Sequence, residues 1–167
     1  MKTILLFRHG KSNWDAAHEH DQERPLSKRG RKAAELMGTF LKAVDEMPGL
    51  ILTSPAVRAA DTAKIAAKGG RWTAPVHTVP TLYEASAGAL LREVQSTPDE
   101  VERLMLVGHE PAWSDFTGRL IGSAAVRFPT AAMARVDFYI PSWRAAEFGH
   151  GEMIWLVTPK MLKKVLK

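Results

Sequence analysis

The tripeptide Arg8-His9-Gly10 contains the residue types needed to bind and transfer a phosphoryl group. It follows the apolar run Ile4-Leu5-Leu6-Phe7, which is typical of a buried strand, and ligands of α/β sheets bind at the carboxyl ends of such strands. Arginine offers a planar fork of donors to phosphate oxygens, and a neutral histidine offers a lone pair that can attack phosphorus. The glycine lets the backbone approach an anion. The tripeptide alone is a weak motif that also fits a strand followed by a basic turn, so its interpretation depends on anion-binding residues at the ends of other strands.

A second apolar run, residues 49–53, also ends in residues suited to anion binding. Ser54 is expected to cap a helix and Pro55 to occupy its first position. Arg58 would then lie one turn into that helix, near its positive pole. Taken alone, Arg58 fits a solvated charge on a helix as well as it fits an anion-binding residue.

A third run, residues 103–108, ends at His109, and a helix is expected from Pro111 onward. His109 alone is as compatible with a structural hydrogen bond at a strand end. Right-handed crossovers bring the carboxyl ends of parallel strands to one edge of a sheet. We therefore expect His109 and Arg58 to meet the Arg8-His9 pair there.

These stretches belong to a longer series that runs in order from residue 4 to about residue 130. The series consists of Leu5-Leu6-Phe7-Arg8-His9-Gly10-Lys11-Ser12, Arg24-Pro25-Leu26-Ser27-Lys28-Arg29-Gly30, Thr53-Ser54-Pro55 with Arg58-Ala59 and Thr62-Ala63, and Leu106-Val107-Gly108-His109, with weaker matches at Leu82-Tyr83-Glu84-Ala85 and Phe128-Pro129-Thr130. In this series the chain resembles the histidine phosphatase superfamily, and within it the small branch of SixA-type phosphohistidine phosphatases. The resemblance implies a phosphoglycerate mutase-like fold, which is a three-layer α/β/α sandwich with a mostly parallel central sheet.

The chemistry expected from this resemblance has two steps. The neutral ring of His9 attacks phosphorus and forms a phosphohistidine intermediate, and water then releases phosphate. Arg8, Arg58 and His109 surround the phosphoryl oxygens, a task that His109 would perform best when protonated. The second ring nitrogen of His9 is expected to donate to a backbone carbonyl. The expected activity is that of a metal-independent phosphatase acting on phosphohistidine, or on another phosphorylated protein or small phosphoester.

Three alternatives concern metal binding, the substrate and turnover. His9 and His109, with Glu110, could instead bind a metal ion, but two arginines beside a divalent cation are unfavourable. We therefore expect no metal and no other cofactor. A small-molecule phosphomonoesterase of the sugar phosphate type is the alternative enzyme, and a phospho-protein binding module without turnover is the alternative outside catalysis.

The general acid has two candidates. Glu84 is the better candidate, because it matches the position of the acid in the family that the chain resembles. Glu110 is the rival, because it directly follows the second histidine, as the acid does in another branch of the superfamily. Either carboxylate is equally compatible with a solvated loop, and a phosphohistidine substrate needs an acid less because imidazole leaves more easily than an alkoxide. Lys11 and Ser12 are expected to contact phosphate or substrate. Arg24 is expected to order its loop by pairing with Asp21 or Glu23.

Composition bounds the partners. The 167 residues are 46% hydrophobic, which predicts a single domain over residues 1–167 with a substantial core and little chain left for a lid. An open pocket suits a phosphorylated protein surface. The formal charge of +5 favours anionic partners, but the basic residues are not interleaved with exposed aromatics, so no nucleic acid is expected. The chain has no cysteine, which excludes thiolate catalysis, and no apolar run of membrane-spanning length. We expect a cytoplasmic monomer or weak dimer with no membrane contact.

The pattern of apolar runs and helix signals predicts alternating strands and helices. Strands are expected near residues 2–8, 49–53, 75–80, 103–108, 132–139 and 152–157, and helices near 28–44, 55–68, 86–96 and 112–121. Ser27 is expected to cap the first helix, and Gly69-Gly70 to end the second. Alternation over residues 132–139 suggests a more exposed strand.

Overall fold

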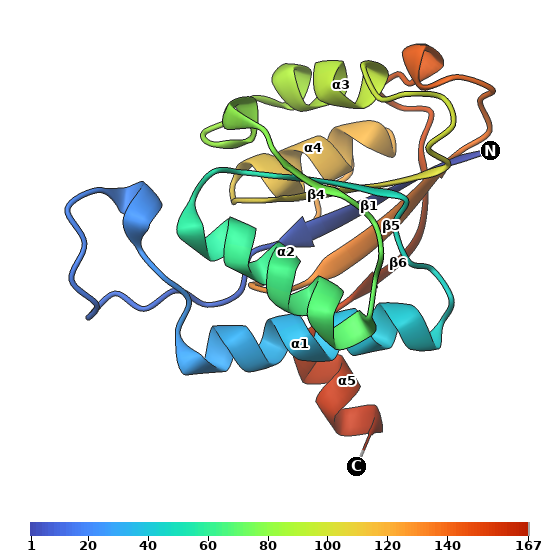
Figure 1. The fold of residues 1–167 in the computed structure, drawn as a ribbon. Coiled ribbons are helices and arrows are strands. Elements are labelled where there is room, and N and C mark those ends of the chain that lie inside the picture. The colour runs from blue at the N-terminus through green and yellow to red at the C-terminus, as the bar shows by residue number, and fades with distance from the viewer. Residues whose placement is uncertain (167) are drawn as a thin grey trace.

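The structure, a computed structural model, describes residues 1–166 and contains one six-stranded sheet in the order β3-β2-β4-β1-β5-β6 (Figure 1). The strands are β1 (Lys2–Arg8), β2 (Leu50–Thr53), β3 (Val76–Thr78), β4 (Arg103–Gly108), β5 (Met133–Phe138) and β6 (Glu152–Val157). The first four strands run parallel, whereas β5 pairs antiparallel with β1 and β6 pairs antiparallel with β5. The mostly parallel sheet expected from the sequence is confirmed, with two antiparallel strands on one side.

Helices cover both faces of this sheet. Within residues 1–166 the α-helices are α1 (Lys28–Ala43), α2 (Val57–Gly70), α3 (Ala87–Gln95), α4 (Ala112–Leu120) and α5 (Pro159–Val165), and short 3-10 helices are η1 (Asp21–Glu23), η2 (Pro80–Leu82) and η3 (Trp143–Ala145). Figure 1 shows α1, α2 and α5 on one face and α3 and α4 on the other, which confirms the three-layer sandwich. No helix in this part of the chain is both long and apolar enough to cross a membrane.

Both faces of β1 are buried because successive side chains of a strand point to opposite sides. Ile4 and Leu6 belong to the core that contains α3 and α4, whereas Leu5 and Phe7 belong to the core that contains α1 and α2. All four side chains are fully buried. The continuous apolar run that precedes Arg8 is therefore the signature of a strand covered on both faces, as in other α/β sheets.

The register between strands places their carboxyl ends at one edge. Arg8 of β1 pairs with Gly108 of β4, so the next residues along the two strands are His9 and His109. On the other side of β4, Thr53 of β2 pairs with Val107. The ends of all three strands therefore reach the same edge of the sheet.

The start of α2 differs from the sequence-based prediction. Helix α2 begins at Val57 rather than at Pro55, and its N-cap residue, Ala56, has no side-chain cap. Ser54 does accept a hydrogen bond from the Ala56 backbone N–H (3.2 Å), but it lies at the end of β2 rather than at the helix cap. By contrast, Ser27 caps α1 as predicted.

The structure differs from the sequence-based prediction in three further places, at the end of α2 and in the second half of the chain. Gly69 and Gly70 are the last two residues of α2, and the C-cap residue that follows them is Arg71, in the left-handed conformation (φ 53°). The predicted exposed strand is wrong, because β5 is covered on both faces and is almost entirely buried. Residues 159–165 form α5, which the sequence analysis did not predict.

Candidate active site

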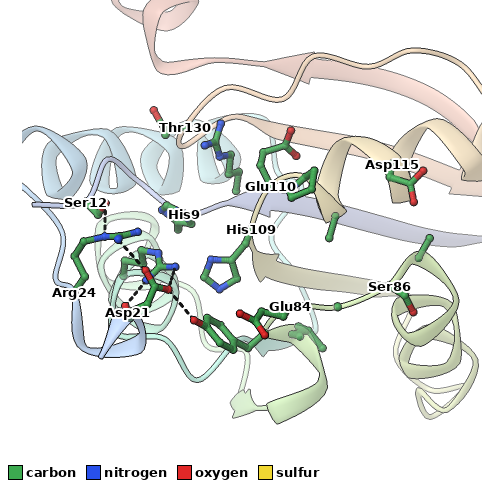
Figure 2. A pocket seen from close by; sticks show the side chains of 18 of the residues that line it. His9, Ser12, Asp21, Arg24, Glu84, Ser86, His109, Glu110, Asp115 and Thr130 are labelled. Carbon is green, nitrogen blue, oxygen red and sulfur yellow. Dashed lines mark hydrogen bonds and ion pairs between the residues drawn. The ribbon is translucent and has the colours of Figure 1, made fainter. Parts of the chain in front are cut away.

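The carboxyl ends of β1, β2 and β4 open into a cleft of about 1160 Å³. The four residues expected to bind and attack a phosphoryl group all line this cleft: Arg8, His9, Arg58 and His109. The other candidates, Lys11, Ser12, Glu84 and Glu110, line it as well. In Figure 2 the labelled side chains of His9, His109 and Asp21 point toward a common space.

His9 has one ring nitrogen engaged and one available. Its Nδ1 lies 2.6 Å from the carbonyl oxygen of Gly10, and because a carbonyl only accepts, Nδ1 donates. This is the arrangement that the sequence analysis expected, and it leaves the lone pair on Nε2. Burial lowers the pKa of His9 to about 4, helped by the nearby Arg58 and Arg8 cations and opposed by the hydrogen bond to Gly10. The ring is therefore neutral near pH 7.

His109 lies against His9, with the two ring centroids 5.1 Å apart. Burial is the main reason that the pKa of His109 is lowered to about 3, and the neighbouring His9 and Arg58 contribute to this lowering. The sequence analysis expected His109 to act best as a protonated ring, whereas these surroundings favour the neutral form. The physical reason is that two imidazoles and several guanidinium groups share one desolvated space, so a further positive charge there is costly.

Arg58 is held by the loop between β1 and α1. Its Nη1 donates to the backbone carbonyl of Asp21 (2.7 Å), and its Nη2 donates to the Asp21 carboxylate (2.8 Å). The same carboxylate pairs with Arg24 (2.8 Å) and accepts from the Tyr83 hydroxyl (2.7 Å). The expected pairing of Arg24 is thus with Asp21 rather than with Glu23. The Arg58 Nε–H is buried and, among the residues described, has no partner, so this edge of the guanidinium can serve an anion.

Asp21 is the main site residue whose importance the sequence analysis missed. Burial alone would raise the pKa of Asp21, but hydrogen bonds from Tyr83 and Arg58 lower it to about 2. The carboxylate is therefore ionised at any pH at which the protein would work. The sequence offered one signal, because Asp21 lies three residues before Arg24 in a polar loop.

Arg8 reaches the cleft from the end of β1. Its Nη1 donates to the carbonyl of Phe128 (2.8 Å), while its Nε–H has no partner within residues 1–166. Burial lowers the pKa of Arg8, and the Glu110 carboxylate partly offsets this effect. The weak sequence match at residues 128–130 therefore contributes a backbone carbonyl that orients Arg8.

The loop after β1 is fixed to the helices around it. The Gly10 backbone N–H donates to Thr62 Oγ1 (3.0 Å), whose hydroxyl donates to the Arg58 carbonyl (2.6 Å). Ser12 accepts a hydrogen bond from Arg24 Nε (3.0 Å), and the Arg24 guanidinium lies 3.5 Å from the ring centroid of Trp14. Ser12 is buried and supports Arg24, whereas Lys11 is exposed at the cleft.

The two candidate acids lie in different surroundings. Both oxygens of the Glu110 carboxylate accept hydrogen bonds from Ser114, at 2.7 Å from its backbone N–H and at 2.6 Å from its hydroxyl. Glu84 is exposed, with a positive φ of 52°, in the segment between η2 and α3.

Comparisons with known proteins agree with this geometry. The family model for the histidine phosphatase superfamily (branch 1) matches residues 4–158, and the chain belongs to that superfamily. An uncharacterised protein of Mycobacterium tuberculosis is 38% identical over 164 residues, which cover 92% of this chain and 99% of the relative. Phosphohistidine phosphatase SixA of Escherichia coli is 26% identical over 163 residues, which cover 96% of each chain.

A solved structure extends the likeness to three dimensions. The structure of the protein histidine phosphatase SixA complexed with tungstate superposes with a TM-score of 0.83 and 25% sequence identity, and the match covers 96% of this chain and 99% of that chain. The resemblance inferred from the sequence is therefore confirmed, both for the superfamily and for the likeness to SixA. Members of the histidine phosphatase superfamily are phosphatases or mutases.

The two neutral buried rings predict a loss of stability in mild acid. In the unfolded chain a histidine has a pKa near 6.5, above the values of about 4 for His9 and about 3 for His109. Between pH 6.5 and 4 the unfolded chain therefore binds protons that the folded protein does not, so stability present above pH 6.5 is lost as the pH falls. From pH 7 to 5 we expect each ring to cost about 2 kcal/mol of unfolding free energy.

Urea unfolding at pH 7 and at pH 5 measures this loss. His109→Asn should flatten the pH dependence by its share, whereas His20→Asn, on the exposed part of the loop, should leave it as in the wild type. An unfolding free energy that stays constant over this interval would contradict the presence of neutral buried rings.

Proposed function

We propose that this protein is a metal-independent phosphatase that removes the phosphoryl group from phosphohistidine on a partner protein. The reaction passes through a covalent phosphohistidine on His9. The observation that carries the proposal is the free Nε2 lone pair of His9 in a cleft edged by two arginines. Membership of the superfamily and the likeness to SixA support the reaction class.

In the first step His9 Nε2 attacks phosphorus. The bond from Nε2 to phosphorus forms while the bond from phosphorus to the substrate's imidazole nitrogen breaks, and that nitrogen keeps the electron pair. The unpartnered Nε–H groups of Arg8 and Arg58 donate to phosphoryl oxygens and stabilise the charge of the transition state. The hydrogen bond from Nδ1 to Gly10 steadies the ring as it becomes cationic.

In the second step water attacks phosphorus and the bond to Nε2 breaks. The electron pair returns to the ring, which is again neutral, and the water proton leaves with phosphate or solvent. The low pKa of His9 favours this step, because burial destabilises a cationic ring and makes Nε2 a better leaving group.

The surroundings of the two glutamates support a phosphohistidine substrate. Both oxygens of the Glu110 carboxylate already accept hydrogen bonds from Ser114, and Glu84 is exposed at the cleft, so the site offers the leaving group no buried, unengaged acid. An alkoxide leaving group needs a proton, whereas an imidazole leaves more readily without one. The site is thus better matched to a bond between phosphorus and nitrogen than to an alkyl phosphate.

The size of the cleft supports a substrate carried on a protein. Pockets for small molecules typically measure about 300–1,000 Å³. This cleft, of about 1160 Å³, exceeds that range and extends from His9 to Gly88 of α3 and Arg119 of α4. A small phosphoester remains the second candidate, since Glu84 lines the cleft and would serve as its acid.

The decisive experiment compares hydrolysis by the wild type and by His9→Ala, with a phosphohistidine peptide, p-nitrophenyl phosphate and a sugar phosphate as substrates. His9→Ala should lose roughly 10³-fold or more in rate with every substrate, because the nucleophile is absent. His20→Ala, an exposed histidine on the same loop, is the matched control and should react as the wild type does. A covalently bound phosphate label that is labile in acid and stable in alkali, present on the wild type and absent from His9→Ala, would identify the phosphohistidine intermediate.

Equal rates for His9→Ala and the wild type would end the claim of a nucleophile. If the wild type hydrolyses none of the substrates but binds phosphohistidine peptide, the protein is a binding module. Faster turnover of the sugar phosphate than of the peptide would favour the phosphomonoesterase.

Substrates with different leaving groups test whether Glu84 or Glu110 acts as a general acid. Glu84→Gln and Glu110→Gln should each change the rate with phosphohistidine peptide by less than about threefold, since no strong acid is used. A loss of about 10²-fold or more with an alkyl phosphate in one variant alone would identify that residue as a general acid. A comparable loss with the phosphohistidine peptide would contradict acid-free departure of imidazole.

Asp21 is expected to act as a positioning residue for Arg58. Asp21→Ala removes the carboxylate that holds Arg58, Arg24 and Tyr83, so the guanidinium should lose its fixed orientation. Misplacing such a group typically costs up to about 10²-fold, and we expect kcat with p-nitrophenyl phosphate to fall by about tenfold or more. Glu23→Ala, whose carboxylate accepts from the backbone of Glu19 and His20, is the control. An unchanged kcat in Asp21→Ala would contradict the positioning role.

A further inference from the structure

Ser54 occupies a position that the proposed chemistry does not explain. It is fully buried at the end of β2, and its hydroxyl oxygen lies 2.7 Å from Nε2 of His109. This contact joins a residue of β2 to the ring that follows β4. No other described side chain makes a hydrogen bond to His109.

The hydroxyl proton of Ser54 decides which group donates in this hydrogen bond. The Ser54 oxygen already accepts from the Ala56 backbone N–H (3.2 Å), and its own hydroxyl proton needs an acceptor. Within residues 1–166, Nε2 of His109 is the one acceptor in hydrogen-bonding contact with that hydroxyl, and Ser54 has no access to solvent. A buried hydroxyl that donates nowhere is costly, so the proton points to Nε2.

If Nε2 accepts, the proton of the neutral ring lies on Nδ1. This nitrogen is buried in the wall of the cleft and, over the described residues, has no partner of its own. An unpartnered buried donor costs free energy unless a ligand supplies the acceptor. The acceptor that fits beside His9 and two arginines is an oxygen of a phosphoryl group.

We propose that Ser54 fixes His109 as the Nδ1–H tautomer, so that the ring presents a neutral N–H donor to a phosphoryl oxygen. This inference rests on the proposed function, because the phosphoryl group supplies the acceptor. Ser54 is a positioning residue that acts through His109, while His109 touches the substrate.

The two histidines then share one tautomer and perform opposite tasks. His9 donates through Nδ1 to the Gly10 carbonyl and turns its Nε2 lone pair to phosphorus. His109 accepts at Nε2 from Ser54 and turns its Nδ1 proton to an oxygen of the same group. The two rings differ in their hydrogen-bond partners. The carbonyl beside His9 makes that imidazole a nucleophile, and the hydroxyl beside His109 makes that imidazole a donor.

Nitrogen NMR of histidine-labelled, ligand-free protein tests the assignment directly. The wild type should show a protonated Nδ1 and an unprotonated Nε2 for His109 near pH 7. In Ser54→Ala the ring loses the donor at Nε2 and should populate the Nε2–H tautomer. Ser54→Thr keeps a hydroxyl and should restore the wild-type pattern. Thr53→Val, which removes a buried hydroxyl one residue away, should not alter the ring.

Titration with inorganic phosphate gives the second measurement. Loss of one neutral hydrogen bond should weaken binding by roughly three- to tenfold in Ser54→Ala, with recovery in Ser54→Thr and no change in Thr53→Val. A wild-type spectrum with the proton on Nε2 of His109 would overturn the proposal even if Ser54→Ala fails to fold. An unchanged tautomer in a folded Ser54→Ala would overturn it as well.

These measurements do not need turnover, so they separate the two proposals. A protein that binds phosphate and shows the predicted tautomer, yet hydrolyses no substrate, would refute the proposed phosphatase and keep the role of Ser54. A protein that hydrolyses phosphohistidine with the proton on Nε2 of His109 would do the reverse.

Discussion

The parallel pairing of β1 with β4 is the constraint on which the site depends. This register sets Arg8 beside Gly108, so that the backbone itself delivers His9 and His109 to neighbouring positions at one edge of the sheet. The pairing register of β1 cannot shift by one residue, because such a shift would turn every buried side chain of β1 toward the wrong core. The packing of both cores therefore fixes the relative positions of the two imidazoles.

Crowding at that edge has an electrostatic consequence. Two imidazoles and Arg58 are buried at this edge with the half-buried Arg8 beside them, and burial keeps both rings neutral. Asp21 supplies the counter-charge, because its carboxylate bridges Arg58 and Arg24 and remains ionised. Asp21 thus orients Arg58 and Arg24 while the Nε–H of Arg58 stays without a partner among the described residues.

The sequence predicted the parts of this design that depend on local patterns. Apolar runs identified the strands, Ser27 identified the start of α1, and the last predicted strand, residues 152–157, matches β6. The sequence did not predict features that depend on tertiary surroundings. The alternation in β5 looked exposed because a sequence does not show which helices cover a strand, and the neutrality of His109 arises from neighbours distant in the chain.

Ser54 illustrates the same limit at the scale of one hydroxyl. Its sequence context, a serine before a proline, is typical of a helix cap, and the hydroxyl does accept from a backbone N–H there. The serine has a second contact because β2 pairs with β4, which brings His109 within reach. A residue type favoured by local structure thereby acquires a role in the site through sheet register. The tautomer of an imidazole is in this way decided by strand pairing, and the chemistry of the cleft is linked to the hydrogen bonds that define the fold.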